Sequence, residues 1–148
     1  MIFNTLLDGC VQKSNWALGD ECFAEMEHLN VAQTNFTLSI LVKMWSKRGD
    51  LDKALECVNA ALQDPAGYRL VDAQVGACIV GACIHNRNPR RALQVFEEMK
   101  GWKHFDGPDI NTYSALISGI PPHGFVRKAV QLADEATINH HAGERRYG

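Results

Sequence analysis

The chain reads FNTLLDG at residues 3–9 and YSALISG at residues 113–119, and shorter versions of this pattern lie between them as LSILV at 38–42 and GACIVG at 76–81. Successive copies start 35, 38 and 37 residues apart. A small residue follows each start at the same distance: Gly19, Ala54, Ala92 and Ala129. A period of this length is typical of stacked supersecondary units and not of one globular core.

Each unit divides into two helices by its apolar spacing. The residues that share one helical face in the first unit are Phe3, Leu6, Leu7 and Cys10. The other units repeat this spacing, and short polar residues such as Asn15, Asp50 and Asn88 precede the second helix as N-caps. The predicted helices cover about residues 2–13, 16–28, 35–47, 51–63, 73–86, 89–101, 110–120 and 125–139.

Paired helices at this period predict an all-α fold, a right-handed α-solenoid of about four helix-turn-helix repeats with eight helices. The predicted repeats cover residues 1–34, 35–72, 73–109 and, in degenerate form, 110–142, followed by a tail at 143–148. They form one continuous domain. Because the chain starts inside a repeat without a polar cap, we expect it to be a piece of a longer array.

Composition limits the function further. The 148 residues are 46% apolar and 22% charged, with 15 basic and 17 acidic side chains and a net charge of -2. This balance gives no global field that favours nucleic acid, so an anionic partner requires a local stripe of positive charge. No stretch approaches the roughly 20 apolar residues of a membrane helix, and no targeting segment is apparent.

The five cysteines are odd in number and match no zinc-ligand spacing. We interpret them as small apolar residues in a reducing compartment. The carboxylates are scattered along the second helices, as on a solvated face, and no titratable groups converge as catalysis requires. We therefore expect no metal, cofactor, small-molecule substrate or membrane partner, and no enzymatic activity.

A second stripe runs along the other face of each first helix, four residues apart. Its leading residues are Asn4, Ser39, Ala77 and Ser114. The side chains that follow are polar or small, and in the second unit they are Lys43 and Lys47, which we expect to contact phosphates. Aligned helices would join these stripes into one concave binding surface. The alternative is a solvated face without a partner.

Several phrases carry a resemblance to one family. They are the two opening phrases at 3–9 and 113–119, ALQVFEEMK at 92–100, KRGDLDKAL at 47–55 and Pro108-Asp109. Together they resemble the pentatricopeptide repeat family over nearly the whole chain. The tetratricopeptide repeat is a poorer match because its period is 34 residues, which no interval here equals.

The resemblance implies binding of single-stranded RNA, one base per repeat, read by two or three side chains. It implies that the leading residues Asn4, Ser39, Ala77 and Ser114 read bases. It gives the first three of them Thr34, Asp72 and Asp109 as partners, and it places bases between Met1, Phe36, Gln74 and Asn111. Ser39 with Asp72 is expected to favour guanine, and Asn4 with Thr34 a pyrimidine, whereas Ala77 departs from the pattern. Asp72 and Asp109 are equally plausible as N-caps.

The expected function is thus sequence-selective RNA binding. The resemblance implies a place in organellar RNA processing, stability, editing or translation, in mitochondria or chloroplasts. The alternative is a protein-interaction scaffold that keeps the repeat shape without binding RNA, which Ala77 and the net charge favour. Other proteins are possible partners under either hypothesis.

Overall fold

The computed structural model describes residues 2–102, 105 and 107–147. Within these residues the chain forms eight α-helices and no strand. The helices are α1 (Ile2–Gln12), α2 (Trp16–His28), α3 (Asn35–Lys47), α4 (Leu51–Gln63), α5 (Ala73–His85), α6 (Pro89–Met99), α7 (Ile110–Gly119) and α8 (Val126–Tyr147). Short 3-10 turns cover Tyr68–Leu70 and Pro121–His123. The predicted all-α repeat solenoid is confirmed.

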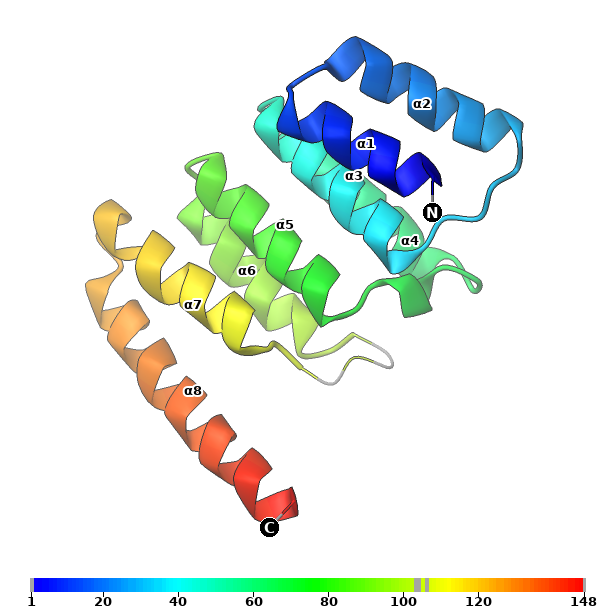
Figure 1. The fold of residues 1–148 in the computed structure, drawn as a ribbon. Helices are drawn as coiled ribbons and strands as arrows, with labels where there is room; N and C mark the ends of the chain where they lie inside the picture. The colour runs from blue at the N-terminus through cyan, green and yellow to red at the C-terminus, as the bar shows by residue number, and fades with distance from the viewer. Residues whose placement is uncertain (1, 103–104, 106, 148) are drawn as a thin grey trace.

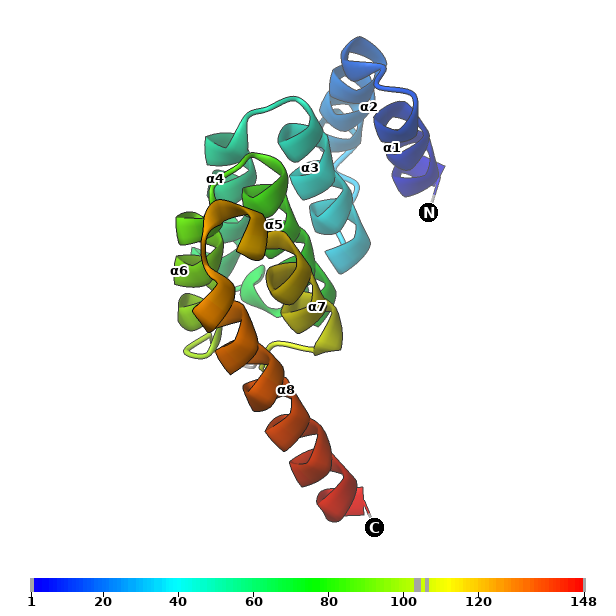
Figure 2. The ribbon, with the colours of Figure 1, turned by 90° about the vertical axis from the view of Figure 1, so that its left-hand side faces the viewer.

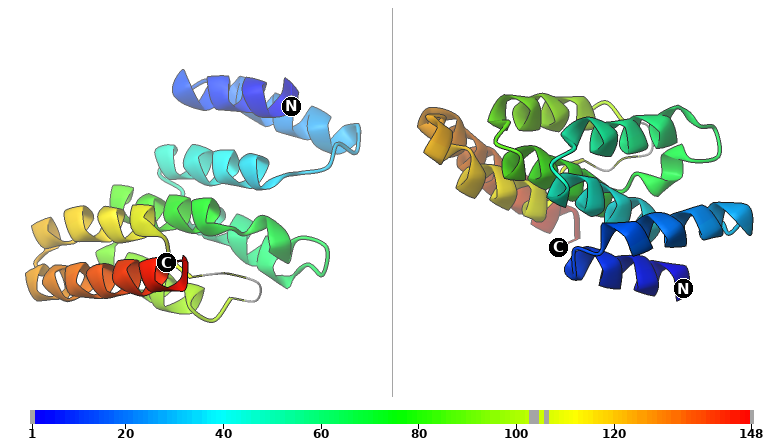
Figure 3. Two further views of the ribbon diagram at one scale, coloured as in Figure 1. Left: turned by 60° about the horizontal axis from the view of Figure 1, so that its bottom comes forward. Right: turned by 90° about the horizontal axis from the view of Figure 1, so that it is seen from above.

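The first helices of the pairs form one layer of the stack. α1, α3, α5 and α7 follow one another side by side, each in contact with the next (Figure 1). After a turn of 90°, α4 and α6 are seen as a second layer on one side of α3, α5 and α7 (Figure 2). The pairs α1–α2 and α7–α8 lie at the two ends of the stack (Figure 3).

Side-chain caps determine where the helices begin. The predicted N-caps Asn15, Asp50 and Asn88 each accept a hydrogen bond from the backbone N–H three residues later, at 3.3, 3.2 and 3.1 Å. Pro89 follows Asn88 at the first helical position, where its missing N–H and fixed φ cost nothing. These local signals explain why the predicted starts of α2, α4 and α6 match the structure.

Two apolar clusters hold the layers together. The larger cluster contains residues of every helix from α3 through α8. It includes the fully buried Phe96, whose ring contacts that of Tyr113 edge-on with 5.3 Å between the centroids. Ala54 and Ala92, from the small-residue column, are fully buried in it. The smaller cluster joins α1 and α2 to the other side of α3. α3 is therefore packed on both sides, which accounts for its eight buried residues.

The structure differs from the sequence expectation at two places. α8 continues to Tyr147 instead of ending near residue 139, so the stretch expected as a tail is helical up to that point, and this end extends away from the stack (Figures 1 and 2). Leu6, expected on the buried face of its helix, is 51% exposed, because none of the helices among the described residues covers that side of α1. The limits of the four repeats stay predictions.

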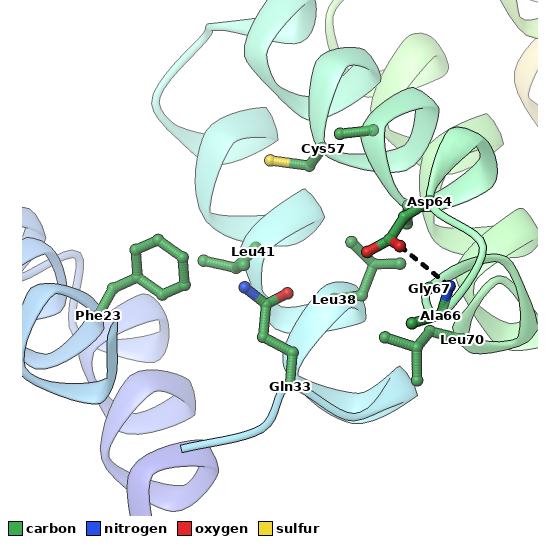
Figure 4. A pocket seen from close by; sticks show the side chains of 11 residues that line it. Phe23, Gln33, Leu38, Leu41, Cys57, Asp64, Ala66, Gly67 and Leu70 are labelled. Atoms are coloured by element: carbon green, nitrogen blue, oxygen red, sulfur yellow. Dashed lines mark hydrogen bonds between the residues drawn. The ribbon is translucent and has the colours of Figure 1, made fainter. Parts of the chain in front are cut away.

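A hollow of about 460 Å³, lined by apolar side chains together with Gln33 and Asp64, separates α2 from α4 (Figure 4). Phe23 borders it on the α2 side, Cys57 on α4, and Leu38 and Leu41 on α3. All five cysteines are free thiols, and two of them, Cys10 and Cys83, are buried. None of the helices in the described ranges has the length and apolar character needed to cross a bilayer.

Candidate nucleic-acid interface

A groove of about 630 Å³ opens along the first-helix layer, between α1 and α3, with α5 at its edge. Its lining residues are Asn4, Thr5, Asp8, Thr34, Phe36, Ser39, Ile40, Lys43 and Gln74. Six of these nine belong to the residues predicted from the sequence to contact RNA. We call this hollow the reading groove, and it spans the junction of the first two units with the start of the third.

Asn4 and Thr34, predicted as one base-reading pair, are hydrogen-bonded to each other. The Asn4 Nδ2 donates to Thr34 Oγ1 at 3.3 Å, and the buried Thr37 hydroxyl donates to Asn4 Oδ1 at 2.7 Å. Thr34 also caps α3 by accepting from the Thr37 N–H at 3.3 Å. The amide of Asn4 is therefore oriented before any ligand arrives, with one N–H hydrogen and part of its oxygen left for a base edge.

Ser39 lies at the groove with its hydroxyl unsatisfied. The residue is 2% exposed, and its Oγ has no hydrogen-bond partner among the described residues. Burial raises the pKa of the Cys78 thiol, and the Lys43 ammonium and the Ser39 hydroxyl oppose this rise. That weak contact with sulfur does not replace an ordinary hydrogen bond. A buried polar group without a partner costs about 1–3 kcal/mol, so a hydrogen bond from this hydroxyl to a ligand would remove that cost.

Asp72, the predicted partner of Ser39, has both carboxylate oxygens engaged. Its Oδ1 accepts from the Val75 N–H at 2.9 Å as the cap of α5, and its Oδ2 accepts from Asn35 Nδ2 at 2.7 Å. Asp72 does not line the reading groove itself. Its partner Asn35, the first residue of α3, lies in the chain between Thr34 and Phe36, which do line the groove.

The predicted stacking and phosphate contacts lie on accessible surface. Phe36 is 55% exposed, and it borders the groove together with the exposed Gln74. Lys43 lines the groove, while Lys47, one turn further along α3, is exposed outside its lining. An aromatic face, short polar groups and an ammonium in one trough match what a single strand of nucleic acid needs.

The later units contribute less. The predicted residues Ala77, Asp109, Asn111 and Ser114 do not line the groove, although Asn111 and Ser114 are exposed on α7. Met1 lies outside the described residues. Asp109 caps α7 through Oδ1, which accepts from the N–H and the hydroxyl of Thr112 at 3.1 and 3.2 Å. Capping is thus the role that its geometry supports.

Two residues with a part in this geometry escaped the sequence reasoning. Thr37 follows the Thr34 cap by three residues, and this spacing is that of a capping box, so the pattern contained a signal for it. Asn35 had no such signal, because its partner Asp72 is 37 residues away. In the described part of the chain, no three His, Cys, Asp or Glu side chains gather closely enough to hold a metal ion.

Because Asp109 caps α7, its replacement is predicted to change the stability of the fold. Asp109→Ala should lower the free energy of unfolding by about 1 kcal/mol, because the α7 amides lose their acceptor. Asp109→Asn should cost only a few tenths, since an amide oxygen also caps. Urea denaturation followed by circular dichroism measures both variants. An alanine variant as stable as the parent would contradict the cap assignment.

Stacked helix pairs with a groove along the first helices of the first two units define a helical-repeat protein of the α-solenoid class. The family sequence model of the pentatricopeptide repeat domain matches residues 77–123, and the family sequence model of the PPR repeat matches residues 1–31 and 36–62. The chain belongs to the pentatricopeptide repeat family, a family of RNA-binding helical-repeat proteins.

Two known proteins are similar to this chain. The mitochondrial 15S rRNA processing factor CCM1 of Yarrowia lipolytica is 25% identical over 146 residues, which is 98% of this chain and 19% of that protein. The crystal structure of the pentatricopeptide repeat protein PPR10 from maize matches with a TM-score of 0.75 and 17% identity over 94% of this chain and 19% of the other. The second likeness concerns the fold, and the chain spans about a fifth of either protein.

Proposed function

We propose that this chain binds single-stranded RNA in the reading groove with sequence selectivity. The observation that carries the proposal is the buried, unpartnered hydroxyl of Ser39 at the groove, between a preoriented amide, Asn4, and an exposed ring, Phe36. Base edges offer a partner to the Ser39 hydroxyl and to the remaining N–H of the Asn4 amide. Phe36 offers a base face a stacking partner worth roughly 1–3 kcal/mol.

The finer assignment follows the family pattern. Ser39 with Asp72 is proposed to favour guanine, and Asn4 with Thr34 a pyrimidine. The Ala77 side chain offers no hydrogen bond, and Ser114 does not line the groove, so we expect the third and fourth units to contribute little selectivity. With a net charge of -2 and few cations at the groove, binding by this chain alone should be weak and sensitive to salt.

The proposed setting is RNA metabolism in an organelle. The name of the Yarrowia lipolytica relative favours mitochondria over chloroplasts and rRNA processing over the other roles that the family suggests. The same proposal covers the role in RNA metabolism of any longer protein that contains this chain.

Selection from a pool of random single-stranded RNAs tests the binding and the base assignment together. We expect the parent chain to enrich a short motif, and Ser39→Asn to change the preferred base at one position of it. Ser39→Ala should erase the preference there while leaving the stability of the fold unchanged or higher, because it removes an unsatisfied buried hydroxyl.

The contrary outcomes are distinct. A motif unchanged by Ser39→Asn would contradict the role of this residue. A chain that retains proteins from an extract but never RNA, at low and at moderate salt, would be the protein-interaction scaffold instead.

A further inference from the structure

The carboxylates of Asp72 and Asp109 hold equivalent places in consecutive repeats but differ in their surroundings. Each precedes a first helix and caps it through Oδ1. Asp72 receives a second hydrogen bond on Oδ2, from Asn35 Nδ2 at 2.7 Å. The residue of the next repeat that corresponds to Asn35 is Ala73, which has no side-chain donor. Asp72 is therefore braced by two helices, and Asp109 is held by one.

The brace connects neighbouring repeats directly. Asn35 is the first residue of α3, whereas Asp72 and the Val75 N–H belong to the start of α5. Both Asn35 and Asp72 are half-buried, which reduces competition from water for the bond between them. A hydrogen bond to a carboxylate is also about twice as strong as one between neutral groups. Together the two donors fix the plane of the Asp72 carboxylate.

This arrangement leaves the carboxylate able to act on a ligand. A carboxylate has about four lone-pair sites, and two are used here, so each oxygen keeps capacity for one more donor. Compared with Asp109, the Asp72 carboxylate has less freedom to rotate. Its remaining lone pairs therefore point in fixed directions relative to α3, which carries Ser39 and Phe36. A preorganised acceptor discriminates between bases more sharply than one that can turn to meet either partner.

We propose that Asn35 is a positioning residue that sets the base selectivity of the second repeat by holding the Asp72 carboxylate. The inference rests on the proposed function, since it assigns Asn35 to the same RNA site. Asn35 acts through Asp72 and is not itself assigned a contact with the base. Selectivity in this repeat therefore depends on a third residue, in addition to Ser39 and Asp72.

The test uses the 148-residue chain and the RNA motif that it enriches from a random single-stranded pool. The position at which Ser39→Asn changes the preferred base belongs to the second repeat. Four fluorescent RNAs that differ only at this position are then titrated with the parent, Asn35→Ala and Asn35→Asp, and binding is followed by anisotropy. A second set of four RNAs, varied at the position next to it, serves as the internal reference.

Both variants should lower the ratio of affinities for best and worst base at this position by roughly three- to tenfold, the range of one hydrogen bond. The ratio at the reference position should stay unchanged. Asn35→Asp is the stronger perturbation, because its carboxylate lacks the donor and also repels the Asp72 carboxylate, which Asn35 contacts at 2.7 Å. An acidic residue in the first turn nevertheless suits the helix dipole of α3. Asn59→Ala and Asn59→Asp, at an exposed position of α4, are the matched controls and should alter neither ratio.

Three results would overturn the inference. Parent-like selectivity in both Asn35 variants would show that the brace is irrelevant to base choice. An equal loss of affinity for every RNA of both sets would mean that Asn35 supports only the fold. If the parent enriches no RNA at all, the proposed function is wrong and this inference fails with it. If the parent binds RNA and Ser39→Asn changes its preferred base, the Asn35 variants test the inference by itself.

Discussion

Replacing Lys43 and Lys47 together by alanine is expected to weaken RNA binding by about ten- to thirtyfold at low salt, because each removes a contact of about 1 kcal/mol with a phosphate. Both side chains are exposed on α3, and Lys43 lines the reading groove. The loss should be similar for every RNA sequence, since phosphates carry no base information. The slope of log affinity against log salt should become shallower by about 1–1.5, from a slope of about 0.7 per phosphate on a single strand.

Fluorescence anisotropy over a series of salt concentrations measures affinity and slope together. The control is Arg127→Ala with Lys128→Ala on α8, which changes the net charge equally at a site remote from the groove. If this pair weakened binding as much as the two lysines, attraction would depend on overall charge and not on the groove. A salt slope unaltered by the loss of Lys43 and Lys47 would contradict their contact with the backbone.

Phe96→Ala should destabilise the fold by about 3–5 kcal/mol. The ring is 0% exposed, it contacts Tyr113 edge-on at 5.3 Å, and the Lys100 Nζ lies 4.7 Å from its centroid. Truncation would leave a cavity between α6 and α7 in the larger cluster. Stacked repeats depend on such interfaces with their neighbours, so a loss of this size should release the C-terminal helix pairs.

Urea denaturation followed by tryptophan fluorescence and circular dichroism measures this effect. Val130→Ala, at a residue of α8 that is 58% exposed, is the control and should change stability by less than about 0.5 kcal/mol. A Phe96→Ala variant that unfolds at the same urea concentration as the parent would mean that this ring does not hold the stack together.

Helix positions followed closely from the residue pattern. Apolar spacing and caps act within a few residues of each other, so the starts at Trp16, Leu51 and Pro89 coincide with those of α2, α4 and α6. The predicted helix at 125–139 was too short, because no capping pattern marks the true end of α8 at Tyr147. The exposure of Leu6 was missed because it depends on which helices surround α1 and not on the spacing within α1.

The candidate site divides in the same way. The repeat period, the family and the polar stripe along the first helices follow from the order of residues along the chain, so they can be predicted without coordinates. Other features of the site depend on contacts between repeats. They are the burial of Ser39, the hydrogen bond from Thr37 to Asn4 and the hydrogen bond from Asn35 to Asp72. Such contacts depend on how closely and at what angle two helices cross, which the packing of the entire stack decides.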